Sequence, residues 1–138
     1  MRDRGSVLML MPAAVLIVLV LGSIAVDFSL AFLAERELVN AASAAANDAA
    51  TYGIDEASFR ERGTVVLDEA RARTAVARSL AARREPLLDR AEVTVDVTAT
   101  QVRVTLRSRA DYLFARAIPG APDSAAVDAT ASASPVSR

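Results

Sequence analysis

The run SVLMLMPAAVLIVLVLGSIAV, residues 6–26, decides the fold of this chain, and it contains no charged side chain. As an α-helix, with a rise of about 1.5 Å per residue, it would be about 31 Å long, which matches the hydrocarbon core of a bilayer. Pro12 lies in its first third, and a proline bends a helix in lipid rather than ending it. We therefore predict a single-pass transmembrane helix over residues 6–26.

The flanks of this run set the expected orientation. Arg2 and Arg4 precede it in a short basic leader, residues 1–5, while Asp27 and Glu35 follow it. Because positively charged flanks stay in the cytoplasm, we expect a cytoplasmic amino terminus and an extracytoplasmic remainder.

A second interpretation of the same run, as a cleavable signal peptide, stays open. Ser23 and Ala25 are small residues at the positions that signal peptidase reads, so cleavage before Val26 would release a small secreted binding domain. The apolar run is long for a signal core, and the helical pattern continues past it without a break. These two features favour the uncleaved anchor.

The outer end of the run carries small residues at helical spacing. Gly22, Ala25 and Ser29 would allow another helix to approach closely. Asp27, the one charge at the membrane edge, lies among them and is a candidate for contact with a neighbouring subunit. These four residues are the predicted helix–helix contact.

The composition excludes most enzyme classes. The chain has no Cys and no His, which removes thiol, imidazole and thiolate-metal chemistry. Its net charge is −1, so no basic surface indicates nucleic-acid binding. A carboxylate hydrolase using Asp27, Asp48 and Asp55 is the remaining alternative, but no spacing assembles these residues. We expect a non-catalytic protein with no cofactor, no metal and no small-molecule substrate.

The helical pattern continues beyond the membrane. Residues 27–53 keep a three-to-four spacing of apolar positions, rich in alanine from residue 41, and Gly53 is a natural stop. We predict one helix from about residue 6 to residue 52. Its alanine-rich part, with few large side chains after Val39, favours a sheet or helix packed closely against it.

A small α+β domain is expected over residues 54–133, with a tail over 134–138. Residues 64–67 resemble a short strand, and Asp68 is a good N-cap for a second helix that Pro86 ends. The expected apolar face of that helix consists of Ala70, Thr74, Ala77, Leu80 and Ala81.

The clearest strand signal is EVTVDVTATQVRVTLRS, residues 92–108. A turn at Ala99-Thr100 pairs Val97 with Val102 and, farther along, Asp96 with Arg103. Apolar residues then meet on one face and opposite charges on the other, so both patterns agree on one register. The segment 112–120 reads as a helical turn whose apolar side chains form a plug, and 125–133 alternates like a third strand.

These segments together resemble a known family. The stretch RGSVLMLMPAAVLIVLVLGSIAVDFSLAFLAERELVNAASAAANDAA, residues 4–50, is similar to the N-terminal segment of TadE/TadG-like proteins of the tight-adherence (Flp) pilus system. The shared features are the basic leader with Gly5, the membrane run, Asp27 beyond it and the alanine-rich stretch. The later pieces VVLDEARARTAV, YLFARAIPG and VDATASA also resemble the extracytoplasmic part of this group.

The resemblance implies a membrane-anchored accessory or pilin-like component in the bacterial cytoplasmic membrane. Its expected partners are the lipid bilayer and other membrane proteins of a pilus or secretion apparatus, with a homo-oligomer or filament as a further option. Pilin-type precursors are cut after a glycine such as Gly5, before Ser6, and carry a glutamate five residues on. Leu10 stands there instead, which favours an uncleaved TadG-like anchor over a processed minor pilin.

Overall fold

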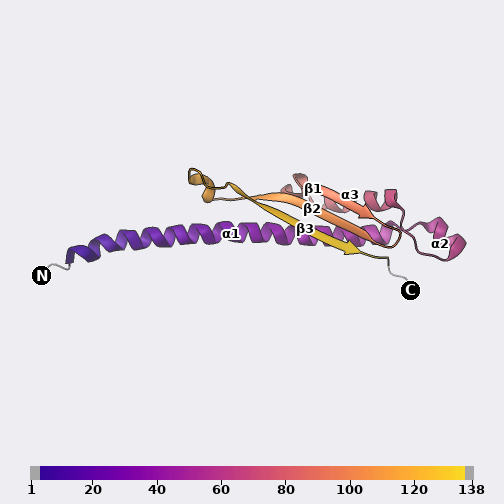
Figure 1. Ribbon diagram of the computed structural model, residues 1–138, viewed down its shortest axis with the longest axis horizontal. Coiled ribbons are helices and arrows are strands. Elements are labelled where there is room, and N and C mark those ends of the chain that lie inside the picture. The colour runs from indigo at the N-terminus through magenta and orange to yellow at the C-terminus, as the bar shows by residue number, and fades with distance from the viewer. Residues whose placement is uncertain (1–3, 136–138) are drawn as a thin grey trace.

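The computed structural model describes residues 4–135, with side chains from residue 10 onward. A long helix runs along most of the molecule, and a small domain covers its C-terminal half and extends past its end (Figure 1). The elements are α1 (Arg4–Tyr52), α2 (Glu56–Arg62), α3 (Glu69–Arg83), α4 (Pro86–Asp89), β1 (Glu92–Val97), β2 (Val102–Asp111), the 3-10 helix η1 (Ala115–Ala117) and β3 (Ser124–Ala133). The expected α+β class is confirmed.

The single long helix expected from residue 6 to residue 52 is confirmed. α1 has 49 residues and continues through Pro12 without interruption. It is long and apolar enough to cross a membrane. Large apolar side chains in its first half are exposed, Val18 at 68% for example.

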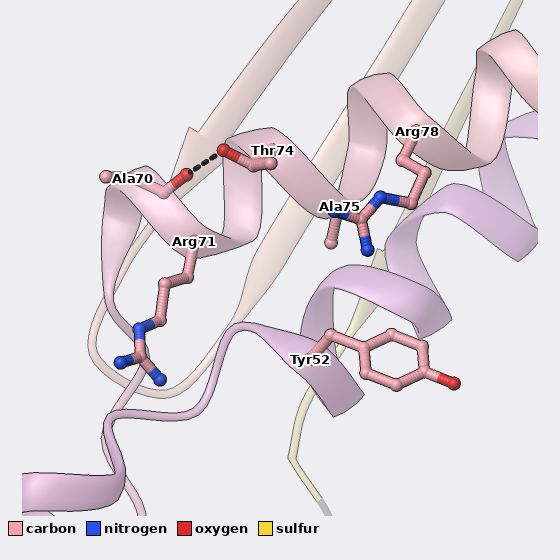
Figure 2. Close-up of a pocket in the computed structure, with 6 residues that line it drawn as sticks. All are labelled: Tyr52, Ala70, Arg71, Thr74, Ala75 and Arg78. Atoms are coloured by element: carbon pink, nitrogen blue, oxygen red, sulfur yellow. Dashed lines mark hydrogen bonds between the residues drawn. The ribbon is translucent and has the colours of Figure 1, made fainter.

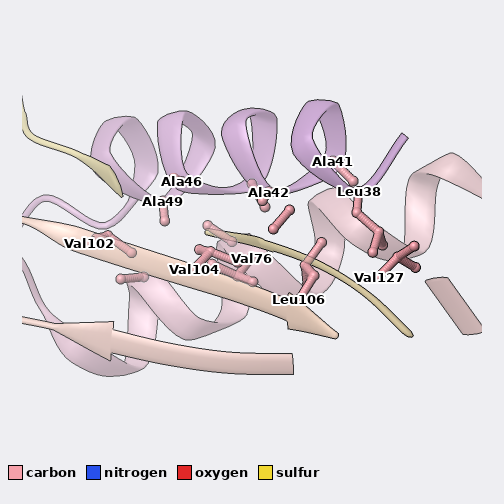
Figure 3. Close-up of a cluster of buried hydrophobic side chains, with 14 of the residues drawn as sticks. Leu38, Ala41, Ala42, Ala46, Ala49, Val76, Val102, Val104, Leu106 and Val127 are labelled. Atoms are coloured by element: carbon pink, nitrogen blue, oxygen red, sulfur yellow. The ribbon is translucent and has the colours of Figure 1, made fainter. Parts of the chain in front are cut away.

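The second half of α1 forms the core of the domain. Leu38 and a series of alanines on one face are fully or almost fully buried: Ala41, Ala42, Ala45, Ala46 and Ala49. They pack against the inward side chains of β2, as Figure 3 shows. Alanine allows this because a side chain of one carbon lets the sheet approach the helix backbone closely. Val39, expected on the same stripe, is 46% exposed.

The sheet is antiparallel, in the order β1-β2-β3. The predicted hairpin register is confirmed, because Val97 pairs with Val102 and Asp96 with Arg103. The third strand is confirmed as well, with Val102 opposite Ala133 and the pairing continuing to Asp111 opposite Ser124. The burial of the central strand alternates, so its inward residues Val102, Val104 and Leu106 are fully buried.

The β2–β3 pair is longer than the β1–β2 pair. Pairing with β1 stops at Arg107, whereas pairing between β2 and β3 continues four residues farther, to Asp111. At about 3.4 Å per residue those four residues add about 14 Å. The extension lies along α1 toward its N-terminal end, and the loop that follows, residues 112–123, lies over the middle of α1 (Figure 1).

α3 begins as predicted but presents a different face. The Asp68 carboxylate accepts a hydrogen bond from the Arg71 backbone N–H at 2.8 Å, which caps the helix. The buried residues are Ala72, Ala75 and Val76, so the expected face through Ala70, Thr74, Ala77 and Ala81 is wrong. Alanine occurs on every side of this helix, and therefore apolar spacing alone does not mark which side packs.

The end of α3 also differs from expectation. The helix ends at Arg83, and Arg84 takes a left-handed conformation with a φ of 51°. Pro86 starts the short helix α4 rather than ending α3. Proline suits this first position because its missing N–H would have no partner there.

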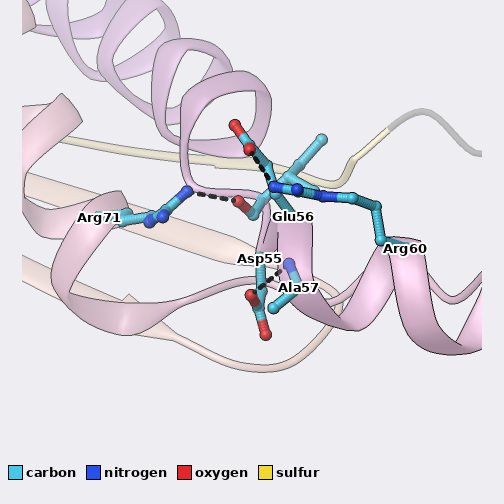
Figure 4. Close-up of polar contacts among 6 residues, drawn as sticks. Asp55, Glu56, Ala57, Arg60 and Arg71 are labelled. Carbon is cyan, nitrogen blue, oxygen red and sulfur yellow. Dashed lines mark hydrogen bonds and ion pairs between the residues drawn. The ribbon is translucent and has the colours of Figure 1, made fainter.

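The segment between α1 and α3 contains a helix that the sequence did not predict. Asp55 caps α2, with its carboxylate accepting from the Ala57 N–H at 3.0 Å (Figure 4). The strand expected over residues 64–67 is wrong, because Leu67 forms an isolated bridge with Ile54 instead. Gly53 sits where α1 meets α3, and a Cβ there would lie 2.9 Å from the Ala72 Cβ.

Candidate site at the outer end of the apolar run

The site is centred on Asp27, which is 95% buried against the loop between β2 and β3 with an exposed fraction of 5%. Its Oδ1 accepts hydrogen bonds from the backbone N–H groups of Leu113, at 2.7 Å, and Phe114, at 3.0 Å. Its Oδ2 accepts from the Ala115 N–H at 2.7 Å. One carboxylate therefore holds three consecutive backbone donors.

These donors are available because of how the loop is built. η1 begins at Ala115, and the first N–H groups of a helical turn have no partner within the turn. An acidic side chain is favourable at that end, since the unpaired N–H groups carry partial positive charge. Asp27 therefore acts as the cap of η1, supplied by a helix 86 residues earlier in the chain.

The loop was expected to form an apolar plug, and that expectation is wrong. Leu113, Phe114 and Ile118 are 57%, 43% and 59% exposed. Asp27 holds the backbone of Leu113 and Phe114, and the Ile118 N–H donates to the Ala115 carbonyl oxygen within the loop. Here a polar contact, rather than apolar burial, holds the loop against α1.

The loop and α1 together enclose an apolar depression of 330 Å³. α1 contributes side chains from Val20 to Asp27, and the loop contributes Phe114, Ala117 and Ile118. Val20 and Ile24 belong to the apolar run 6–26, so this depression lies beside the predicted membrane segment.

The predicted helix–helix residues lie at the same level of α1. Gly22, Ala25 and Ser29 are exposed, and the Ser29 hydroxyl donates to the Ala25 carbonyl oxygen at 2.7 Å within the helix. This small-residue surface is therefore open in the single chain. Its contact with another helix, and that of Asp27, remain predictions.

The four residues named for proteolytic processing all lie on α1. Ala25 and Val26 stand in its uninterrupted middle, two residues and one residue before the bound Asp27. Gly5 and Ser6 lie in its first turn, where the structure describes the backbone alone. Arg2, in the basic leader of residues 1–5, lies outside the described residues. Cleavage at either place remains a prediction.

The three carboxylates of the hydrolase alternative are not brought together. Asp27 and Asp48 are 21 residues apart on one helix, which is about 32 Å along its axis. Asp48 accepts a hydrogen bond from the Ser79 hydroxyl at 2.6 Å, joining α1 to α3. Each carboxylate thus serves a separate structural contact.

Asp55 serves as the cap of α2 and accepts from Ser58 as well, at 2.6 Å. The hydrogen bond from the Ser58 hydroxyl, followed by that from the Ala57 N–H, holds the pKa of the Asp55 carboxyl below its usual value. No cluster of three or more acidic side chains within the described part of the chain is arranged to hold a metal ion.

A second depression, of 310 Å³, lies at the far end of the molecule (Figure 2). Tyr52 at the end of α1 and two arginines of α3, Arg71 and Arg78, line it with smaller residues. The Arg71 guanidinium donates a long hydrogen bond, of 3.5 Å, to the Ile54 carbonyl oxygen. Asp48 lines a neighbouring depression that shares Tyr52, Ala75 and Arg78 with this one.

The comparison with protein families falls on the helix that carries the Asp27 site. Residues 5–51 match the family described as Putative Flp pilus-assembly TadE/G-like. The N-terminal segment is TadE/G-like. The resemblance expected from the sequence is confirmed there, and the match covers α1 almost to its end but not the domain that follows. No curated protein and no solved structure matches the chain.

Sequence reasoning found half of this site. Asp27 stood out as a lone charge at the end of the TadE/G-like apolar run, whereas its partners are backbone N–H groups, which any residue type supplies. Two features of the sequence hinted weakly at this contact. One is the acid Asp27 on the long helix, and the other is a short helical turn, residues 115–117, with no acidic residue of its own in its first turn.

Proposed function

We propose that this protein is a membrane-anchored structural component of a Flp pilus assembly or related secretion apparatus, with no catalytic role. The observation that carries the proposal is the TadE/G-like match over residues 5–51, the same segment that forms the long helix with an exposed apolar half. A family of pilus-assembly proteins and a helix of this kind both fit a standing anchor.

The proposed location is the bacterial cytoplasmic membrane, with residues 6–26 in the bilayer. Arg2 and Arg4 would lie in the cytoplasm, and the domain built on the second half of α1 would lie outside. The charge asymmetry supports this direction, because Arg2 and Arg4 directly precede the run, whereas the first arginine after it is Arg36, ten residues beyond Val26.

The proposed partners are the lipid bilayer and other membrane proteins of the apparatus. The exposed small-residue surface of Gly22, Ala25 and Ser29 supports a close contact with a neighbouring helix. That neighbour is either another component or a second copy of this chain.

The contacts of three acidic residues support the proposed absence of catalysis. Asp27 binds the loop, Asp48 binds Ser79 and Asp55 caps α2, so the three carboxylates of the hydrolase alternative are engaged in contacts within the chain. With no Cys and no His in the chain, few nucleophiles and bases remain.

The test begins with the intact mass of the native protein from washed membranes. We expect the full-length mass, apart from the loss of Met1. A chain starting at Ser6 would instead indicate a processed minor pilin, and a chain starting at Val26 a secreted domain.

The second part of the test asks about the apparatus. Deletion of the gene should abolish surface Flp pili, and the wild-type chain should restore them. A triple variant, Asp48→Asn with Ser79→Ala and Tyr52→Phe, that folds and restores pili would agree with the absence of a catalytic role for these residues. Normal pili in the deletion strain would contradict the proposal.

A further inference from the structure

We propose that the β2–β3 loop, residues 112–123, enters the outer leaflet of the same bilayer, so that the chain contacts lipid at two places. The inference rests on the proposed membrane anchor. It adds a second lipid-binding surface, formed by Leu113, Phe114 and Ile118 of the loop together with the exposed side of α1 beside them.

The loop lies at the level of the apolar run along α1. The loop residues Phe114 and Ile118 line a common depression with Val20 and Ile24 of α1. Val20 stands six residues before Val26, the last residue of the apolar run, which is about 9 Å along the helix. The loop therefore lies beside a part of α1 that is below the expected outer edge of the hydrocarbon core.

Moving the membrane toward the N-terminus does not remove this overlap. If Val20 lay outside the bilayer, residues 6–19 would have to span it, and 14 residues of helix cover only about 21 Å. A hydrocarbon core of about 30 Å needs about 20 residues. Any placement that lets α1 span the bilayer thus brings the loop into contact with it.

The backbone N–H groups of the loop are mostly hydrogen-bonded within the protein. Unsatisfied N–H groups are costly in lipid. The N–H groups of Leu113, Phe114 and Ala115 donate to Asp27, and that of Tyr112 donates to the Asp123 carbonyl oxygen at 2.8 Å.

The rest of the loop follows the same pattern. The N–H groups of Ala117, Ile118 and Ala121 donate to carbonyl oxygens within the loop, and Pro119 and Pro122 have none. Most donors of this irregular segment are thus already paired inside the protein.

The large apolar side chains of the loop form an exposed surface next to that of α1. Leu113, Phe114 and Ile118 are about half exposed. On α1 the exposed apolar surface continues past Asp27 through Phe28, with 68% of the residue exposed, and Phe32, with 62%. Aromatic and aliphatic residues next to polar ones are typical of segments that lie in the interface of a bilayer.

The charges agree with this position. The Asp27 carboxylate is buried on backbone donors of the loop rather than facing lipid. The exposed acids Asp111 and Asp123 stand at the two ends of the loop, where β2 ends and β3 begins. Arg116 in the loop is exposed, and a long arginine side chain reaches from apolar surroundings to lipid headgroups. The first exposed charges of α1 beyond the loop are at Glu35 and Arg36.

The experiment uses single tryptophans in the full-length chain, which has no tryptophan of its own. Leu113→Trp and Ile118→Trp report on the loop, and Val18→Trp reports on the anchor. Phe59→Trp on α2 is the matched control, because Phe59 is 54% exposed, close to the 57% and 59% of the loop residues, but lies at the far end of the molecule.

Each variant is reconstituted into vesicles of phosphatidylcholine and phosphatidylglycerol, with or without bromine on the acyl chains. We expect lipids brominated near the headgroup to quench the fluorescence of both loop tryptophans. Both should also emit at a shorter wavelength than the tryptophan of Phe59→Trp. Val18→Trp should be quenched most by lipids brominated near the end of the acyl chain.

Two outcomes separate this inference from the proposed anchor. If Val18→Trp is quenched while both loop tryptophans behave like Phe59→Trp, the loop does not enter the bilayer and the inference fails alone. If Val18→Trp is not quenched either, the anchor fails and the inference falls with it. Quenching of one loop variant alone, with the other unquenched and folded, would also contradict it.

Discussion

The two halves of α1 share one backbone conformation but carry opposite kinds of surface. From residue 10 to residue 33 the large apolar side chains are exposed, whereas from Ala41 to Ala49 one face consists of alanines that are fully or almost fully buried. The difference teaches that the size of the apolar side chains, more than their hydrophobicity, separates a helix surface suited to lipid from one suited to close packing in a protein. Asp27 lies within the exposed part and binds the β2–β3 loop, which ties the domain on the second part to it.

The largest expected effect comes from placing the same charge in each half. Val18→Arg should remove the protein from washed membranes, because an arginine at the centre of a spanning helix costs roughly 3 kcal/mol for insertion. Val39→Arg is the matched control, since Val39 is exposed outside the proposed span. The readout is the membrane-bound fraction on an immunoblot. Equal membrane binding by both variants would contradict the assignment of the two halves.

The next effect uses one enlargement in each half. Ala45→Leu should lower the free energy of unfolding by about 1–3 kcal/mol, because Ala45 is fully buried and the sheet leaves no room for three more carbons. Ala25→Leu, on the exposed half, should leave the unfolding of the domain unchanged. Chemical denaturation in detergent micelles, followed by circular dichroism, measures both. A stable Ala45→Leu protein would show that the packing is loose.

Asp27→Asn tests the link between the halves. Asparagine keeps one acceptor but loses the charge and turns an N–H toward the loop donors, and hydrogen bonds to a charged group contribute roughly 1.5–3 kcal/mol. The amides of residues 113–115 should therefore exchange with deuterium faster. Asp123→Asn, at the other end of the loop, should leave their exchange unchanged. Unaltered exchange in Asp27→Asn would mean that apolar contacts hold the loop.

The smallest effect is a pH dependence at the far end of the domain. The pKa of the Asp55 carboxyl is lowered in the folded chain, mainly by the Ser58 hydroxyl. The ionised carboxylate therefore stabilises the fold above the unfolded pKa of about 3.9, and this contribution is lost as the pH falls through the lower folded pKa.

Urea unfolding of the wild type and of Asp55→Asn measures that contribution. The wild type should be the more stable of the two at about pH 6, where the carboxylate is ionised in both states. The difference should shrink as the pH falls below about 3.9. A constant difference at all pH values would assign the contribution to shape rather than to charge.

Much of the domain was predictable from local pattern. The hairpin register followed from two alternations that agree, valine facing valine and Asp96 facing Arg103, since a shift by one residue would break both. The caps at Asp68 and Gly53 follow from backbone chemistry close in sequence.

The errors came where local pattern carries no information. The buried face of α3 was misplaced because alanine occurs all around that helix, and α2 was missed because its seven residues are mostly polar. In the candidate site, Asp27 was visible but its partners were not, since backbone N–H groups leave no mark on the residue types.

The sequence by itself determined the long helix, the change from large to small side chains after Val39 and the pairing of the strands, because each rests on the types and spacing of neighbouring residues. The tertiary structure alone decided that the β2–β3 loop returns to Asp27 and leaves Leu113, Phe114 and Ile118 exposed beside the apolar run. That arrangement depends on how far β2 and β3 extend past β1 along α1, a length set by the packing of the sheet on the alanine face of the helix.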